Sequence, residues 1–281
     1  IVCMKTKISI IMPAKNELAG LRQIIPSIQQ LYHDAEIIIV DDGSTDDTQA
    51  YCREMGIICI SHPYSKGNGA AIKTGAKSAS GDVLVFMDAD GQHNSADIKS
   101  LLEQLEKGHD MVVGARDRKS QANILRHIAN TFYNRLASWI VGQEIDDLTS
   151  GLRAVDATKF KEFLYLLPNG FSYPSTVTMA FFKSGYSVSY MPVFLQKRIG
   201  KSHIKPTRDF IRFFLIIFKI GTLYSPLKIF LPLSLLSFSL GILNYFYTYF
   251  MYGSFTNMSM LLITTSLLIF LIGLISEQVT M

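Results

Sequence analysis

The chain has 281 residues, a formal net charge of +4 and 48% hydrophobic residues, so it is long enough for one or two domains and unusually apolar for a soluble protein. The positive charge is concentrated, because residues 193–228 hold eight basic side chains and one acidic one. Residues 1–192 lack the basic surplus of a nucleic-acid-binding domain, and we expect no nucleic-acid partner. The spacing of Cys3, Cys52 and Cys59 fits no metal or redox motif.

The first part of the chain alternates short apolar runs with segments of helical periodicity. Strands are expected over residues 8–12, 36–40, 57–60, 83–87 and 111–114. Helices are expected over 18–31, 47–55, 67–79, 95–106, 123–141 and 175–183. This alternation predicts an α/β fold with a mostly parallel sheet and helices on both faces.

Polar residues follow the first, second and fourth of these strands. In open α/β sheets the ligand lies at the carboxyl ends of the strands, so these loops should converge on one edge. Asp88 and Asp90 come directly after the fourth strand, one residue apart, and both can reach one ion. Hard carboxylate oxygens suit Mg²⁺ or Mn²⁺, which commonly also holds substrate phosphates. The alternative is a strand that ends in an ordinary polar turn.

Five segments, in this order and spacing, resemble the family 2 glycosyltransferases with the GT-A fold. They also resemble, within that family, the polyprenyl-phosphate glycosyltransferases, which include dolichyl-phosphate mannose and glucose synthases and their bacterial undecaprenyl-phosphate relatives. The segments are Met12–Glu17, Val40–Asp46, Asp88–Gln92, Asp147–Arg153 and Gly200–Lys205. The resemblance implies transfer of one sugar, with inversion, from a nucleotide-diphosphate sugar to dolichyl or undecaprenyl phosphate. The donor could be UDP-glucose, UDP-N-acetylhexosamine or GDP-mannose.

The resemblance also implies which residues form the site. The donor's base and ribose are expected at Pro13, Asn16, Glu17 and Asp42. The metal ion is expected on Asp88, Asp90 and Gln92. The acceptor phosphate is expected at Arg116, Arg126 and Asn130, with Ser150 and Arg153 near the sugar. We expect Asp88, Asp90 and Arg126 to carry catalysis.

Several further residues are assigned by their chemistry and position. Glycines 67 and 69 would allow a ligand to approach the backbone closely, and Lys66 beside them is either a donor contact or a solvated lysine. The basic and hydroxyl groups ahead of the membrane segment, which we expect to meet the acceptor phosphate, are Lys201, Ser202 and Lys205. Arginine suits a phosphate because its planar guanidinium donates two parallel hydrogen bonds.

The C-terminal part is apolar. Residues 229–276 contain no Lys, Arg, Asp or Glu, and a membrane-spanning helix needs about 20 apolar residues. We expect two spans, at about 225–251 and 258–276. Residues 206–221 mix aromatic and basic side chains, typical of an amphipathic helix in the membrane interface, although a helix packed on the sheet is an alternative. The expected parts are a catalytic domain over 1–200, an interfacial region over 201–224 and a transmembrane hairpin over 225–281.

The sequence also predicts how the chain sits in a lipid bilayer. No signal peptide precedes the first strand, and the basic block adjoins the first span, so we expect the catalytic domain on the cytoplasmic side. The hairpin would make this an integral membrane protein, and a homo-oligomer through the hairpin is compatible with the sequence.

Two other functions fit the sequence. A glycosyltransferase acting on a hydroxyl group would need a carboxylate as general base, and Asp146 or Asp147 could serve. A membrane protein without catalytic activity could bind nucleotide sugars or assist the flipping of lipid-linked sugars. The Asp88 and Asp90 pair argues against this second alternative.

Overall fold

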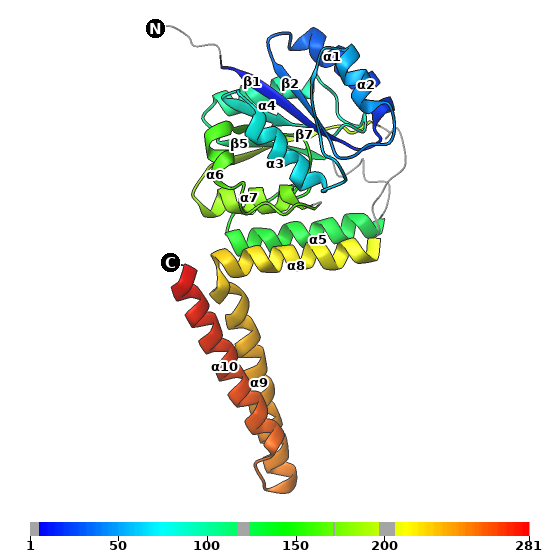
Figure 1. The fold of residues 1–281 in the computed structure, drawn as a ribbon. Coiled ribbons are helices and arrows are strands. Elements are labelled where there is room, and N and C mark those ends of the chain that lie inside the picture. The colour runs from blue at the N-terminus through cyan, green and yellow to red at the C-terminus, as the bar shows by residue number, and fades with distance from the viewer. Residues whose placement is uncertain (1–5, 117–123, 171, 197–205, 281) are drawn as a thin grey trace.

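The computed structural model describes residues 6–116, 124–170, 172–196 and 206–280, with side chains described except at 124–129, 206–213 and 280. The first part of these residues forms an α/β domain around one seven-stranded sheet (Figure 1). Its elements are β1 (Ile8–Ala14), α1 (Leu18–Leu31), β2 (Glu36–Asp41), α2 (Thr48–Glu54), β3 (Ile58–Ser61), α3 (Asn68–Ser78), β4 (Val83–Phe86), α4 (Asp97–Glu106), β5 (Met111–Arg116), α5 (Ile124–Val141), β6 (Arg153–Asp156), α6 (Ala157–Glu162), α7 (Tyr173–Lys183) and β7 (Val188–Val193).

The strand order in the sheet is β3-β2-β1-β4-β6-β5-β7. Four of the strand pairs are parallel, whereas β6 runs antiparallel to both of its neighbours, β4 and β5. The predicted mostly parallel α/β sheet is therefore confirmed, and β6 adds an antiparallel strand that was not predicted. The carboxyl ends of β1, β2 and β4 lie at one edge, as ligand-binding α/β sheets require.

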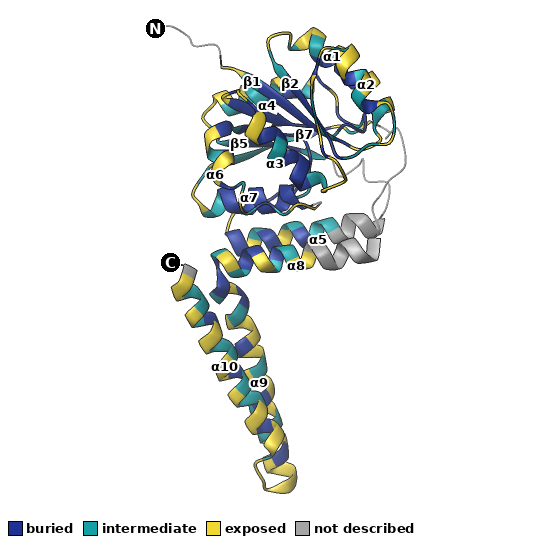
Figure 2. Cartoon of the chain, viewed as in Figure 1, coloured by how far each residue is buried: buried dark blue, intermediate teal, exposed yellow. Residues whose placement is uncertain are grey.

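Successive side chains of each strand point to opposite faces of the sheet, and helices pack on both faces. Ile10 of β1 packs into a cluster with residues of α1 and α4, such as Leu21 and Ile98. The next residue, Ile11, packs into a second cluster with residues of α3 and α7, such as Ile72 and Phe181. Figure 2 shows β1, β2 and α7 as largely buried. This rigid double-sided core fixes the strand ends that present the polar loops.

Two long helices separate the sheet domain from the C-terminal helices. α5 and α8 (Pro206–Tyr224) lie side by side, and their axes run across the direction of the C-terminal pair (Figure 1). A third apolar cluster joins them, in which Ala137 and Ile140 of α5 meet Ile217 and Ile220 of α8 and Met179 of α7. α8 is thus attached to the sheet domain through α5 and α7.

The C-terminal residues form a hairpin of α9 (Pro226–Tyr252) and α10 (Asn257–Thr280). Both helices are long and apolar enough to cross a membrane. The turn between them begins at Gly253, whose φ of +64° is a left-handed conformation that glycine adopts without strain. Asn244 Nδ2 donates to Ser259 Oγ at 2.9 Å, and the Leu227 N–H donates to Glu277 at 3.0 Å, so polar contacts fix the pair at both ends.

Candidate active site

The loops that follow β1 and β2 are tied together by Asn16. Its φ is +55°, a left-handed conformation that Asn tolerates better than most residues. Its backbone N–H donates to Ser44 Oγ at 2.9 Å, and its side-chain Oδ1 accepts from the Thr45 N–H at 2.7 Å. Asn16 therefore joins the two loops into one surface, which we call the donor wall, where the donor's base and ribose are predicted to bind. Pro13, near the end of β1, and Glu17, on the loop that follows, are half-buried.

Asp42 is buried at the end of β2 and organises the loop after β3. Its carboxylate accepts four hydrogen bonds, from the His62 ring at 2.8 Å, the Ser65 hydroxyl at 2.7 Å, and the Lys66 and Gly67 N–H groups at 2.8 and 2.9 Å. Burial would raise the pKa of Asp42, but these hydrogen bonds, led by that of His62, outweigh it and lower the pKa. Asp42 shapes the donor edge in this arrangement, and its direct contact with the donor stays a prediction.

The segment that opens α3 packs its glycines against another loop of the chain. A Cβ on Gly69 would lie 2.0 Å from the Pro168 carbonyl oxygen, and one on Gly67 would lie 2.4 Å from that of Asn169. The Gly69 N–H donates to the Gly170 carbonyl at 2.9 Å. The close approach that these glycines allow is made here by the chain's own loop, and a ligand contact at this segment stays a prediction. The Lys66 side chain is exposed and its Nζ lies 5.8 Å from the Tyr64 ring centre.

Asp88 and Asp90 stand directly after β4, as predicted. The backbone between them rests on α1, because a Cβ on Gly20 would lie 2.1 Å from the Ala89 carbonyl oxygen. Asp90 is buried and its Oδ1 accepts from the Gln92 N–H at 3.1 Å, whereas the Asp88 side chain is 40% exposed. Gly151 lies against Asp88, since a Cβ there would lie 2.3 Å from Oδ2. The two aspartates thus lie one residue apart just beyond the carboxyl end of β4.

The residues at this position fit a hard divalent ion. Two carboxylates and an amide oxygen would supply only oxygen ligands, which Mg²⁺ and Mn²⁺ prefer. Gln92 is held near them, because its carbonyl accepts from the Gln196 N–H at 2.8 Å and its Nε2 donates to the Gln196 carbonyl at 3.4 Å. Within the described residues no group of three or more His, Cys, Asp and Glu side chains forms a metal site. Asp88, Asp90 and Gln92 stay the predicted ligands.

Arg116, at the end of β5, and Asp147, in the loop before β6, form an ion pair. Arg116 Nε lies 2.7 Å from Asp147 Oδ2, and Nη2 lies 2.8 Å from Oδ1. Arg116 Nη2 also donates a hydrogen bond to Thr149 Oγ1, and the Thr149 N–H donates one to Asp147 Oδ1. Burial would raise the pKa of Asp147, but the hydrogen bonds and charge of Arg116 outweigh it and lower the pKa. Asp147 is therefore held ionised and paired.

Ser150 and Arg153 support the same loop from inside. Ser150 Oγ donates to the Gly114 carbonyl at 2.6 Å. Arg153 is fully buried, and its guanidinium donates to the carbonyls of Ser150 and Pro174 at 2.5 and 3.2 Å and lies 5.7 Å from the Tyr173 ring centre. Because Arg153 is fully buried and donates to these backbone carbonyls, its side chain stabilises the loop. A direct contact with sugar or phosphate stays a prediction for both.

The remaining predicted acceptor residues are placed less fully. Asn130 is half-buried on α5. Arg126 belongs to α5, but its side chain lies outside the described residues, as do Lys201, Ser202 and Lys205. Three residues at the site were not predicted as part of it. Gly20 and Gly151 matter only through close packing, and His93 is buried beside Asp88 rather than exposed on a turn.

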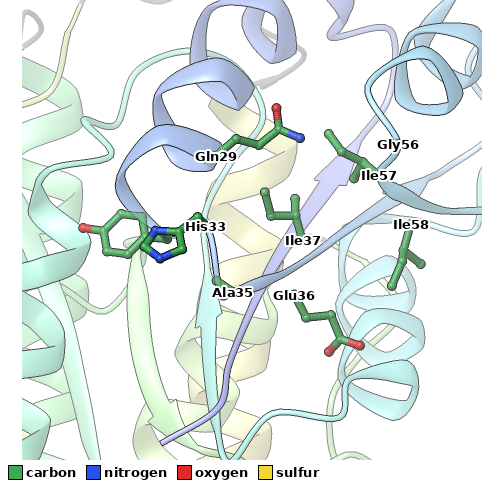
Figure 3. Close-up of a pocket in the computed structure, with 9 residues that line it drawn as sticks. Gln29, His33, Ala35, Glu36, Ile37, Gly56, Ile57 and Ile58 are labelled. Atoms are coloured by element: carbon green, nitrogen blue, oxygen red, sulfur yellow. The ribbon is translucent and has the colours of Figure 1, made fainter. Parts of the chain in front are cut away.

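A separate cavity of about 360 Å³ lies at the opposite edge of the sheet (Figure 3). It is lined by Gln29 and His33 and by Glu36 and Ile58, which are the first residues of β2 and β3. The carboxyl ends of those strands carry the polar loops, so this cavity lies away from the aspartates. It takes no part in the candidate site.

Comparison with known families matches two parts of the chain. Residues 9–164 match the family described as glycosyl transferase family 2, and residues 225–281 match the GtrB C-terminal hairpin. The first match covers more than half of the chain and includes the Asp88 and Asp90 segment. The second covers α9 and α10.

Two curated relatives are similar to large parts of the chain. The undecaprenyl-phosphate 4-deoxy-4-formamido-L-arabinose transferase of Proteus mirabilis is 33% identical over 158 residues, which are 53% of this chain and 48% of that protein. The chain thus spans about half the length of this relative. The polyprenol monophosphomannose synthase of Mycolicibacterium smegmatis is 28% identical over 213 residues, which are 69% of this chain and 79% of that protein.

A solved structure shares the fold. The glucosyl-3-phosphoglycerate synthase of Mycobacterium tuberculosis, crystallised with Mn²⁺, UDP-glucose and phosphoglyceric acid, superposes with a TM-score of 0.64 at 19% identity. The likeness covers 77% of this chain and 80% of that one. The expected GT-A-like fold is confirmed.

Proposed function

Because the chain belongs to glycosyltransferase family 2, we propose that it transfers one sugar from a nucleotide-diphosphate sugar to the phosphate of a polyprenyl phosphate. One observation carries the proposal. The edge with Asp88 and Asp90 belongs to a GT-A-like domain that is joined, through α5 and α8, to an apolar hairpin in the same chain. A transferase built in this way can meet a soluble donor and a lipid acceptor at one site. The names of the two curated relatives support the acceptor class.

The donor half of the site lies at the ends of β1, β2 and β4. Asn16 joins the first two loops into the donor wall, and Asp42 holds the next loop in place. When bound at Asp88 and Asp90, Mg²⁺ or Mn²⁺ would neutralise the negative charge that develops on the departing nucleoside diphosphate. The Mn²⁺ and UDP-glucose named with the mycobacterial structure support a divalent ion and a uridine donor. GDP-mannose stays the alternative donor.

The state of Asp147 argues against it as the general base for a hydroxyl acceptor, which leaves Asp146 as the other carboxylate considered for that role. A hydroxyl group needs a general base whose pKa lies near the working pH. Arg116 lowers the pKa of Asp147 and occupies both of its oxygens, so Asp147 is a poor base. A lipid phosphate is already anionic and needs no base. Its oxygen would attack the anomeric carbon directly, which inverts the configuration and requires no enzyme nucleophile.

The acceptor phosphate would bind between the carboxylates and the membrane surface. Arg126 and Asn130 of α5, together with Lys201, Ser202 and Lys205, are the groups we propose for it. Two anionic reactants repel each other, and positive side chains that hold both lower this cost in a site of reduced dielectric.

The membrane surface is proposed to lie along α5 and α8. Large apolar side chains on both helices are exposed although the helices pack against each other, namely Phe132, Trp139, Phe214, Leu215 and Leu223. Exposed apolar side chains beside an apolar hairpin fit the headgroup boundary of a bilayer. The basic residues near α8 support a cytoplasmic orientation.

The test uses the full chain, purified in detergent, with undecaprenyl phosphate and a panel of nucleotide sugars. We expect one donor to give a glycosylated lipid and one equivalent of nucleoside diphosphate. We expect no product with undecaprenol, which lacks the phosphate, and none with Asp88→Asn. Transfer to undecaprenol at a rate equal to that with undecaprenyl phosphate would contradict the proposed acceptor.

A further inference from the structure

His93 has surroundings that an ordinary turn residue would not have. It lies between β4 and α4, and its side chain is only 5% exposed. Its Nε2 lies 3.8 Å from Asp88 Oδ2, and its Nδ1 is buried without a hydrogen-bond partner among the described residues. A buried polar atom without a hydrogen-bond partner destabilises the fold, so a histidine in this place calls for an explanation.

The contact with Asp88 favours one tautomer of the neutral ring. A neutral imidazole has one N–H donor and one acceptor nitrogen. Because Nε2 faces a carboxylate, the proton belongs on Nε2, where it points at negative charge. The acceptor lone pair then belongs on Nδ1, the nitrogen without a partner.

Asp88 is enclosed on two sides. Gly151 lies against its carboxylate, with room for no side chain, and the His93 ring faces Oδ2. The separation of 3.8 Å is longer than a hydrogen bond, so a small rotation of the carboxylate is needed to close it. The Asp88 side chain is 40% exposed, whereas the His93 side chain is only 5% exposed.

We propose that His93 is a positioning residue, which holds the Asp88 carboxylate through Nε2–H in the orientation that binds a divalent ion. The inference rests on the metal site proposed above and adds a residue to it. Hydrogen-bond partners of metal-binding carboxylates orient the ligand, and their loss typically costs about 10–100-fold in metal affinity.

The test measures Mn²⁺ binding by the full chain in detergent, without donor or acceptor, from the electron paramagnetic resonance signal of free Mn²⁺. We expect His93→Leu to raise the Kd by about 10-fold or more. His93→Gln keeps an N–H donor of similar reach and should recover most of the affinity. His33→Leu, at an exposed histidine on the opposite edge, is the matched control and should bind as the parent does.

Asp88→Asn separates the inference from the metal site itself. If Asp88→Asn loses Mn²⁺ and His93→Leu binds as tightly as the parent, the role of His93 is overturned and the metal site stands. If Asp88→Asn binds Mn²⁺ as the parent does, the metal site is wrong and the inference fails with it. Should His93→Leu fail to fold, His93→Gln must bind Mn²⁺ more tightly than the shorter His93→Asn, and equal affinities would overturn the role.

Discussion

Arg116 donates two hydrogen bonds to the carboxylate of Asp147, from Nε to Oδ2 at 2.7 Å and from Nη2 to Oδ1 at 2.8 Å. Arg116 ends β5, and Asp147 begins the loop that leads to β6, so the pair fixes that loop beside Asp88. Arg116 is predicted to bind the acceptor phosphate, and Asp147 is considered as a general base, so this contact involves both candidate residues. The pair therefore constrains both the binding chemistry and the reaction class.

The Arg116–Asp147 pair predicts a pH-dependent stability. The pKa of Asp147 is lowered in the folded chain, so the pair stabilises the fold above the unfolded value of about 3.9 and ceases to do so as the pH falls through the lower folded value. Asp147→Asn leaves Arg116 without its charge partner and should cost about 3 kcal/mol at pH 7. Thermal unfolding in detergent should show a gap between parent and variant that shrinks below pH 4. A gap that stays constant from pH 7 to pH 3 would contradict this.

Gly151 should be intolerant of even one methyl group. In Gly151→Ala the new Cβ would lie 2.3 Å from Asp88 Oδ2, so the carboxylate must move away. We expect activity to fall by about 10-fold or more, as for other losses of ligand orientation, with little change in Tm. Gly170→Ala is the matched control, because a Cβ there would meet no atom within 4 Å. Equal activity of the two variants would argue against the packing of Gly151 on Asp88.

The only tryptophan of the chain reports directly on the proposed membrane surface. Trp139 lies on α5 and is 49% exposed. In vesicles we expect its fluorescence to be quenched by lipids brominated near the headgroup more than by lipids brominated deep in the acyl chain, as for interfacial tryptophans. The variant Trp139→Phe with Tyr51→Trp moves the probe to α2, far from the hairpin in Figure 1, and should escape quenching. Equal quenching of both probes would contradict the orientation.

The hairpin turn should face the compartment opposite to the sheet domain. The test variant has its three cysteines replaced by serine and carries Ser254→Cys, an exposed position in the turn. In sealed vesicles with the cytoplasmic side outward, an impermeant maleimide should label Ser254→Cys only after permeabilisation. Lys107→Cys, exposed at the end of α4, should react at once. Immediate labelling of the Ser254→Cys variant would contradict the topology.

The regular part of the fold followed from periodicity, and the exceptions have physical reasons. The prediction located five strands, because buried strands of a parallel sheet are continuous apolar runs. It missed β6, whose four residues begin with Arg153 and end with Asp156 inside a polar loop. It also missed β7, whose apolar run is interrupted by Ser189 and Pro192. Proline is tolerated there because β7 lies at the edge of the sheet.

The site was predictable in position and less so in its contacts. Polar residues at strand ends converge on one edge because of the topology, so Asp88 and Asp90 could be placed from the chain order alone. The hydrogen-bond partners of a site residue cannot be predicted from chain order when they are distant in the sequence. Asp147 lies 31 residues from Arg116, and His62 lies 20 residues from Asp42. The burial of His93 likewise depends on how neighbouring elements pack over one turn.

The most direct measurement of the central claim is the ³¹P spectrum of the purified product lipid. Transfer to the phosphate oxygen converts a phosphate monoester into a diester, which loses the ionisation that a monoester shows near pH 6 to 7. We therefore predict a product signal whose chemical shift does not move between pH 5 and pH 8, from a lipid that releases its sugar in mild acid. A product whose phosphorus signal still titrates as a monoester would carry the sugar elsewhere and would contradict the claim.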